Sequence, residues 1–244
     1  MIKFFRKIRQ DLLSKGKTGK YFKYAIGEVV LVVIGILIAL QINNWNENKK
    51  QEQRAIIYAN KIINDIKTDL KNIDSLVVVG QRNVKEIENY FNYFENQDPV
   101  DIRMLIDSCS NVIKDVMRKY RYTPNNHTFK DMQASGNSTL LSEDQKKALV
   151  ALSNTQDFYL IVFEKIISSI IEYERQMKAY IDSDLSKSNF FERINITQNE
   201  NDLVQGLLFQ HNSLTSYSEL YEYTLRLKKR ISDESNFALI TLKN

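Results

Sequence analysis

Residues 24–45 read YAIGEVVLVVIGILIALQINNW, and this stretch decides how the chain is built. Within it, residues 29–40 form an unbroken run of apolar residues and glycine. A helix rises 1.5 Å per residue, so about twenty residues are enough to cover the roughly 30 Å of hydrocarbon in a bilayer. The strongly polar residues of the stretch lie near its two ends: Glu28 at the start, and Gln41, Asn43 and Asn44 at the finish. The stretch therefore predicts a single membrane-spanning helix.

Two other interpretations of this stretch stay open, namely a cleaved signal peptide and a buried helix of a soluble protein. The flanks favour a retained span, because Trp45 is an aromatic residue of the kind found at the bilayer interface. A cleavage site would need small residues after the apolar run, and the sequence from Ala39 onward matches that pattern poorly. Basic residues precede the span: Lys3, Arg6, Lys7, Arg9, Lys15, Lys17, Lys20 and Lys23.

The charge on the two sides of the span predicts its orientation. The eight basic residues of segment 1–23 are accompanied by one acid, Asp11, whereas residues 47–54 mix both signs. The positive-inside rule then places the N-terminus in the cytoplasm. Since the whole chain has a formal net charge of +4 and the tail supplies +7, the rest is net negative. The tail is thus expected to bind anionic lipid headgroups, and no nucleic-acid partner is expected.

Composition predicts an all-α fold. Together with the predicted span, it indicates one N-terminal transmembrane helix followed by an antiparallel extracytoplasmic helical bundle of long, coiled-coil-like helices. Two prolines and seven glycines in 244 residues leave few helix breakers. The predicted parts are a basic amphipathic tail (1–23), the span (24–45), the bundle (46–232) and a C-terminal tail (233–244). The lone cysteine, Cys109, excludes an internal disulfide.

Apolar residues at alternating spacings of three and four predict the first outer helix, which we expect to continue directly from the span. They are Ile56, Ala59, Ile63, Ile66, Leu70, Ile73, Val77, Gly80, Val84, Ile87, Phe91 and Phe94. No polar residue interrupts this seam. It therefore predicts a helix of about five heptads with one buried face.

Capping residues predict where the later helices begin. Asp98 and Pro99 resemble an N-cap and a first helical residue, and Ser142 with Gln145 forms a capping box. A short helix over 128–134 is expected to end at Gly136, and the last helix to run from Asp202 to about Ile231. The apolar seam of the third long helix includes one amide, Gln156. Such an amide more often fixes the register of a bundle than binds a ligand.

Small residues lie along one side of the predicted span, at Gly27, Gly35 and Ala39, and Glu28 borders them. Small side chains let two membrane helices approach closely, so these four residues are the predicted helix–helix interface. A carboxylate at membrane depth also allows an alternative, in which Glu28 conducts ions in an oligomer. Its position near the cytoplasmic end favours an interfacial role instead.

The segment from 127 to 141 is the least periodic part of the outer region. It is either an ordinary connection or a binding or contact loop that uses His127, Phe129, Ser135, Gly136 and Asn137. The second histidine, His211, is far from the first in sequence, and neither belongs to a pair with ligand spacing. We predict no catalytic residue, no cofactor site and no metal site, and hence no enzyme.

Two stretches of the sequence resemble those of a known family. Residues 3–47, KFFRKIRQDLLSKGKTGKYFKYAIGEVVLVVIGILIALQINNWNE, are similar to the signature of a family of uncharacterised single-span membrane proteins common in Bacteroidota, a domain of unknown function. Residues 129–141, FKDMQASGNSTLL, resemble its second recurrent block. The resemblance implies a bacterial inner-membrane protein with a helical periplasmic portion. It implies no activity and no substrate.

Two functions are compatible with these features. The first is a membrane-anchored structural or interaction protein of the cell envelope, which self-associates or joins a larger membrane complex. The alternative is a periplasmic sensory or small-ligand-binding module. That alternative predicts a closed pocket on the order of several hundred cubic ångströms, lined by aromatic and a few polar groups.

Overall fold

A computed structural model describes residues 6, 10, 18–117, 121–181 and 199–243. These residues form helices joined by short connections, and none of them lies in a strand. The all-α prediction is confirmed. By their internal contacts the residues divide into two compact units, residues 1–57 and residues 58–244.

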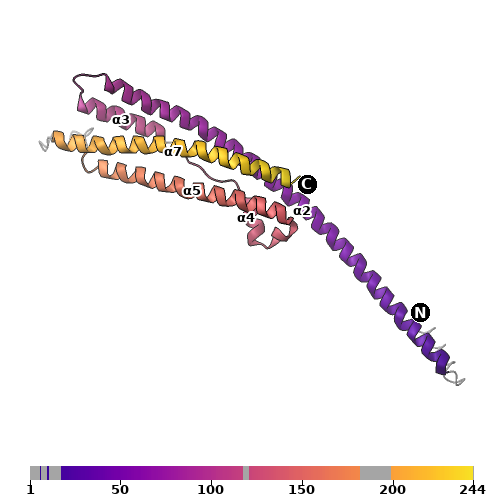
Figure 1. Cartoon of the computed structure of the whole chain (residues 1–244). Helices are drawn as coiled ribbons and strands as arrows, with labels where there is room; N and C mark the ends of the chain where they lie inside the picture. Colours follow the sequence, from indigo (N-terminus) through magenta and orange to yellow (C-terminus); the bar gives the residue numbers. More distant parts are fainter. Residues whose placement is uncertain (1–5, 7–9, 11–17, 118–120, 182–198, 244) are drawn as a thin grey trace. The chain divides into compact units, whose positions relative to one another are not determined.

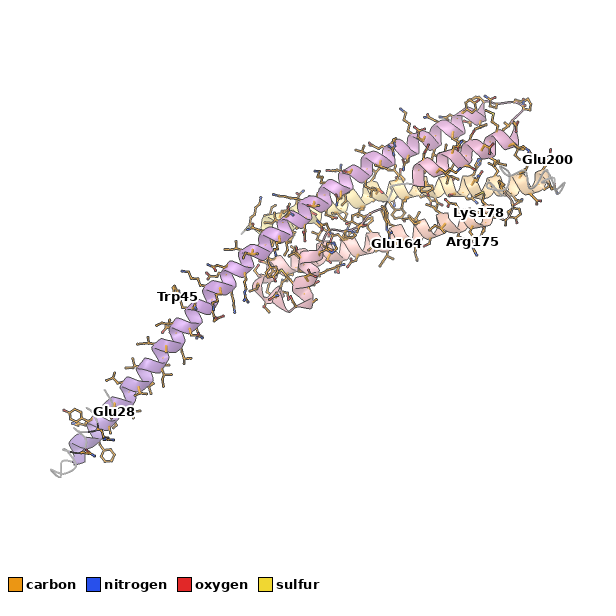
Figure 2. All side chains as sticks on the ribbon, turned by 180° about the vertical axis from the view of Figure 1, so that it is seen from behind. Glu28, Trp45, Glu164, Arg175, Lys178 and Glu200 are labelled. Atoms are coloured by element: carbon orange, nitrogen blue, oxygen red, sulfur yellow. The ribbon has the colours of Figure 1, made fainter. Side chains whose placement is uncertain are left out.

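The first unit contains the N-terminal part of α2 (Thr18–Glu95). This helix continues without interruption from the predicted span into the first outer helix, as expected. Figure 2 shows Glu28 and Trp45 on this part of α2. No residue of its most apolar window is buried, and among the described residues α2 is the one helix long and apolar enough to cross a membrane. Most of the predicted amphipathic tail lies outside the described residues.

The second unit is a helical bundle (Figure 1). Besides the C-terminal part of α2, it contains α3 (Ile102–Met117), α4 (His127–Ala134), the short 3₁₀ helix η1 (Asn137–Leu140), α5 (Glu143–Met177) and α7 (Glu200–Thr241). Gln145, near the start of α5, donates to the carbonyl of Thr241 at the end of α7 (3.3 Å). Gln210, near the start of α7, contacts Met177 at the end of α5 (3.7 Å). These two helices are therefore antiparallel, as predicted for the bundle.

The buried face of α2 differs in part from the predicted apolar seam. Its buried residues recur mostly at spacings of four and three but include polar side chains: Ile62, Ile66, Asp69, Ile73, Leu76, Val77, Gly80, Asn83, Ile87, Tyr90 and Phe94. The predicted Ile56 is 61% exposed, and Phe91 is also exposed. Asn83 is tolerated inside because its amide donates to the carbonyl of Val116 (3.2 Å). The sequence pattern found the apolar part of this face, and it missed Asp69 and Asn83 because it counted apolar residues only.

Two of the predicted helix boundaries are wrong. Helix α3 begins at Ile102, and the carboxylate of Asp101 accepts hydrogen bonds from the backbone N–H groups of Arg103 (2.8 Å) and Met104 (3.2 Å). Both Asp98 and Asp101 are good capping residues, so local preference did not choose between them. Helix α7 extends to Thr241, although residues 233–244 were predicted to be a tail.

The extension of α7 has a packing cause. Ala238 is fully buried and Leu242 nearly so, and both continue the buried face of Ile231 at helical spacing. Among the polar residues that follow Ile231, Asp233 and Asn236 are exposed, whereas Ser235 is buried. Other local predictions are confirmed. Gly136 follows α4 in the left-handed conformation (φ 74°), and Ser142 with Gln145 forms the capping box of α5.

Candidate functional site

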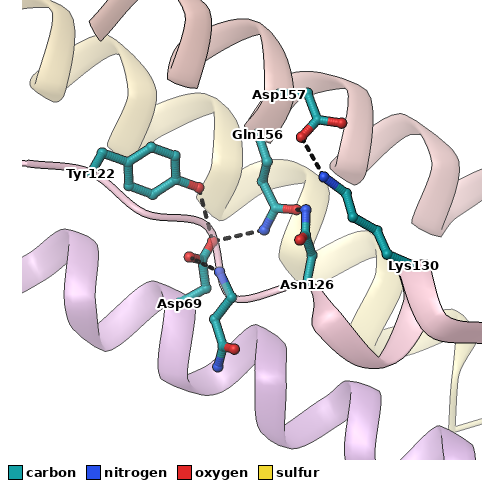
Figure 3. A network of polar contacts seen from close by, with 7 residues as sticks. Asp69, Tyr122, Asn126, Lys130, Gln156 and Asp157 are labelled. Carbon is teal, nitrogen blue, oxygen red and sulfur yellow. Dashed lines mark hydrogen bonds and ion pairs between the residues drawn. The ribbon is translucent and has the colours of Figure 1, made fainter. Parts of the chain in front are cut away.

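A buried carboxylate, Asp69, lies on the inner face of α2 and joins three segments of the second unit (Figure 3). It accepts hydrogen bonds from the Tyr122 hydroxyl (3.2 Å) and the Gln156 amide (2.8 Å) at one oxygen. Its other oxygen accepts from the backbone N–H of Asn125 (3.0 Å). Both carboxylate oxygens are therefore satisfied by donors from the connection before α4 and from α5. We call Asp69, Tyr122, Asn125, Asn126 and Gln156 the Asp69 network.

Asp65, one helical turn before Asp69, extends these contacts to α4. Its Oδ2 accepts from the backbone N–H of Thr128 (3.1 Å), and its carbonyl accepts from the Asn125 amide (3.4 Å). Thr128 lies in the first turn of α4, where backbone N–H groups have no partner within the helix. A carboxylate of α2 thus caps another helix. The Asn126 amide donates to the Gln156 carbonyl oxygen (2.9 Å), so the connection is also held to α5.

Burial dominates the electrostatics of the network. It raises the pKa of Asp69, although the hydrogen bonds from Asn125, Gln156 and Tyr122 act in the opposite direction. Burial, followed by the charge of Asp69, also raises the pKa of Tyr122, so the phenol remains a hydrogen-bond donor. Beside the network, Lys130 and Asp157 form an exposed ion pair (2.7 Å). Such an exposed pair contributes little to stability.

The raised pKa of Asp69 predicts a pH dependence. Because the native state holds this proton more tightly than the unfolded chain, the contribution of Asp69 to stability is greatest below the unfolded pKa of about 3.9. It decreases as pH rises from there through the higher native pKa. We therefore expect the free energy of unfolding of the wild type, relative to Asp69→Asn, to fall as pH increases. Urea unfolding of both proteins at a series of pH values measures this difference, and a rise with pH would contradict it.

The predicted contact residues of segment 127–141 do not form one open loop. Phe129 is buried in the core, whereas His127 and Ser135 are exposed. Asn137 donates to the hydroxyl of Tyr58 on α2 (3.4 Å) and to the Ser135 hydroxyl (2.8 Å). With Gly136 ending the turn after α4, the segment is packed against α2 and α5.

Sequence reasoning identified one member of the Asp69 network, Gln156, as a buried amide. It missed Asp65 and Asp69, because acidic residues within an apolar pattern are ordinarily solvent-exposed. Their four-residue spacing was the available signal, since it places both on one side of a helix. The partners Tyr122 and Asn125 come from a connection whose position no local pattern indicates.

A second polar contact joins α2 to α7. The Tyr90 hydroxyl lies 2.8 Å from His211 Nε2, and Tyr90 is next to Cys109 of α3 in the core. Burial raises the pKa of the Cys109 thiol to about 12, so the thiolate needed for nucleophilic chemistry is scarce. Burial also lowers the pKa of His211. His127 lies exposed on α4, and no hydrogen bond or ring contact among the described residues joins it to His211.

The predicted helix–helix interface lies on α2 in the first unit. Gly27, Gly35 and Ala39 are exposed, and Glu28 is half-buried. A Cβ atom added at Gly27 or Gly35 would have no atom within 4 Å. The described chain therefore leaves open the space that a second helix would need.

Two hollows bear on ligand binding. The one beside the Asp69 network has a volume of about 10 Å³, which is about the size of one water molecule. The other, of about 450 Å³, is an open groove between α5 and α7. Charged residues and one tyrosine line this groove: Tyr159, Arg226, Lys229, Arg230, Asp233 and Glu234.

A family model matches residues 28–219, which is more than half of the chain and includes the whole Asp69 network. The chain belongs to the family of unknown function DUF6090. The match begins at Glu28 in the apolar stretch and ends within α7, so the DUF6090 region combines the apolar helix with most of the bundle. No curated protein and no solved structure matches this DUF6090 chain.

Proposed function

We propose that this DUF6090 protein is a membrane-anchored structural or interaction protein of the cell envelope, which self-associates or joins a larger membrane complex. In this proposal it crosses the bacterial inner membrane once, with the basic tail on anionic headgroups in the cytoplasm and the bundle in the periplasm. The carrying observation is the exposed small-residue side of α2, where Gly27 and Gly35 have open space around them. Helices associate in membranes through such residues, because their backbones can come close.

The small hollow inside the bundle favours an interaction protein over a module that encloses a ligand. A sensory or small-ligand module needs a pocket of several hundred cubic ångströms that buries most of its ligand. The hollow next to segment 122–141 has about 10 Å³, and the groove of about 450 Å³ is open to solvent. The Asp69 network also holds α2, α5 and the connection before α4 together. This is expected of a rigid bundle whose surface binds another protein.

Disulfide crosslinking in native membranes tests the proposal. We expect Gly35→Cys and Ala39→Cys to form a crosslinked dimer, or an adduct with one partner, several-fold more efficiently than Val33→Cys. Val33 is the matched control, because at 3.6 residues per turn it lies roughly opposite the small residues of the same helix. The native Cys109 can stay in place, since it is fully buried and its thiol has a pKa of about 12.

The mass of the crosslinked product distinguishes self-association from a complex with another protein. A dimer formed through Gly35→Cys supports self-association, and a discrete adduct of higher mass supports a complex with another protein. Equal yields at Gly35, Ala39 and Val33, or no product at any of them, would contradict self-association through this side of α2.

A further inference from the structure

Polar side chains lie between α5 and α7 where the end of α5 meets the start of α7. The sulfur of Met177 on α5 lies 3.7 Å from the amide nitrogen of Gln210 on α7. Because the helices are antiparallel, Glu174, one turn before Met177, lies opposite Ser213, one turn after Gln210. Burial, followed by the charge of Glu174, raises the pKa of Tyr217, one turn after Ser213. Ser213 therefore lies between two contacts that join the same helices.

Three oxygen atoms in this contact lack a hydrogen-bond partner. Among the described residues, Glu174 Oε1, Gln210 Oε1 and Ser213 Oγ are buried and form no hydrogen bond. Gln210 is 1% exposed and Ser213 is 0% exposed. Native proteins rarely leave a buried polar atom unpaired, because its hydration is lost and nothing replaces it. Three such atoms on facing turns of two helices point to a ligand that contacts all of them. We call Glu174, Gln210 and Ser213 the α5–α7 oxygen site.

A hydrogen bond to α3 orients the Gln210 side chain. Its amide nitrogen donates to the hydroxyl of Ser110 (2.7 Å). The nitrogen is thereby occupied, so Oε1 is the atom of Gln210 that is left for a ligand. Outer hydrogen bonds of this kind commonly hold the ligating side chains of metal sites in place. Glu174 is only half-buried, so the α5–α7 oxygen site can be reached from solvent on that side.

We propose that the α5–α7 oxygen site binds one monovalent cation, Na⁺ or K⁺, through Glu174, Gln210 and Ser213. A carboxylate, an amide carbonyl and a hydroxyl each offer a lone pair, and hard cations prefer oxygen ligands. One carboxylate balances one positive charge. Ca²⁺ takes six to eight oxygen ligands, and the described part of the chain has no group of three or more acidic, histidine or cysteine side chains placed to hold a metal.

The bound cation would hold the end of α5 to the start of α7. Solvent on the exposed side of Glu174 supplies the remaining ligands of the ion. This site is separate from the small-residue side of α2, on which the proposed function rests, so either can fail without the other.

Thermal unfolding of the full-length protein in detergent tests the α5–α7 oxygen site. The melts are compared in sodium, potassium and N-methylglucamine chlorides at one ionic strength, because the organic cation is too large for a buried site. A ligand that binds only the native state raises Tm as its concentration increases. We expect Tm of the wild type to rise by about 3–6 °C when the bound alkali ion reaches ten times its dissociation constant.

Two variants and a control locate the effect. Glu174→Gln removes the charge and keeps the shape, and Ser213→Ala removes one ligand, so both should lose the dependence of Tm on the alkali ion. Glu172→Gln is the matched control. Glu172 lies on the same helix and pairs with Arg175 (3.0 Å) at the surface, so this variant should keep the full dependence.

A proton on Glu174 is the competing explanation, because burial raises the pKa of this carboxyl against the opposing charge of Lys178. In that case Glu174→Gln would raise Tm equally in all three salts, and the cation proposal would be overturned. Equal melting of the wild type in the three salts would also overturn it. Equilibrium dialysis against radioactive sodium or rubidium gives a readout independent of unfolding: we expect one ion per chain for the wild type and Glu172→Gln. An undiminished amount bound to Ser213→Ala and Glu174→Gln would contradict the site.

Discussion

Asp69→Ala is expected to destabilise the bundle by about 3–5 kcal/mol, because it leaves several buried donors without an acceptor. The Tyr122 hydroxyl, the Gln156 amide and the Asn125 N–H all donate to this carboxylate in the wild type. None of the three can recover a hydrogen bond from water without opening the contact between α2, α5 and the connection. Urea unfolding followed by circular dichroism, with the full chain in detergent, measures the change.

Asp74→Ala is the control for Asp69. Asp74 lies on the same helix, is exposed, and pairs with Lys228 across the surface (2.8 Å). An exposed ion pair is worth at most about 1 kcal/mol, so this variant should unfold close to the wild type. If both variants lose the same stability, Asp69 has no special role and the network is not what holds the connection.

Phe163→Ala is the second change with a large expected effect, a loss of about 3–5 kcal/mol. Phe163 is 1% exposed in the middle of α5, and its ring lies 6.0 Å from that of Tyr122. Removing the ring loses its burial and leaves a cavity that the surrounding helices cannot close, since interiors are densely packed. The same unfolding measurement detects the loss.

Phe158→Ala supplies the comparison for Phe163. Phe158 lies five residues earlier on the same helix but is 59% exposed, so its truncation should change stability by no more than about 0.5 kcal/mol. The pair therefore separates the effect of burial from that of removing a phenyl ring from α5. A similar loss for both variants would mean that the outer side of α5 is covered in the intact protein, and this would revise the assignment of its exposed face.

The local features of this chain could be predicted because neighbouring residues cause them. The apolar run of residues 29–40 makes part of α2 apolar enough to span a membrane, and the scarcity of glycine and proline favours long helices. The Ser142 and Gln145 capping box and the left-handed Gly136 depend on contacts within a few residues. The prediction of helix ends was wrong at two places. Asp98 and Asp101 are equivalent capping residues at the start of α3, and packing extends α7 beyond Ile231.

The sequence by itself determined that the protein is helical, that α2 carries a stretch able to span a membrane, and where α5 begins. Only the tertiary structure decided which polar residues join the buried face of α2. That face includes Asp69, whose hydrogen-bond partners Tyr122 and Gln156 lie 53 and 87 residues further along the chain. A carboxylate is stable inside a bundle only if donors meet it there. Whether they do depends on how distant helices pack, which no periodicity within α2 can reveal.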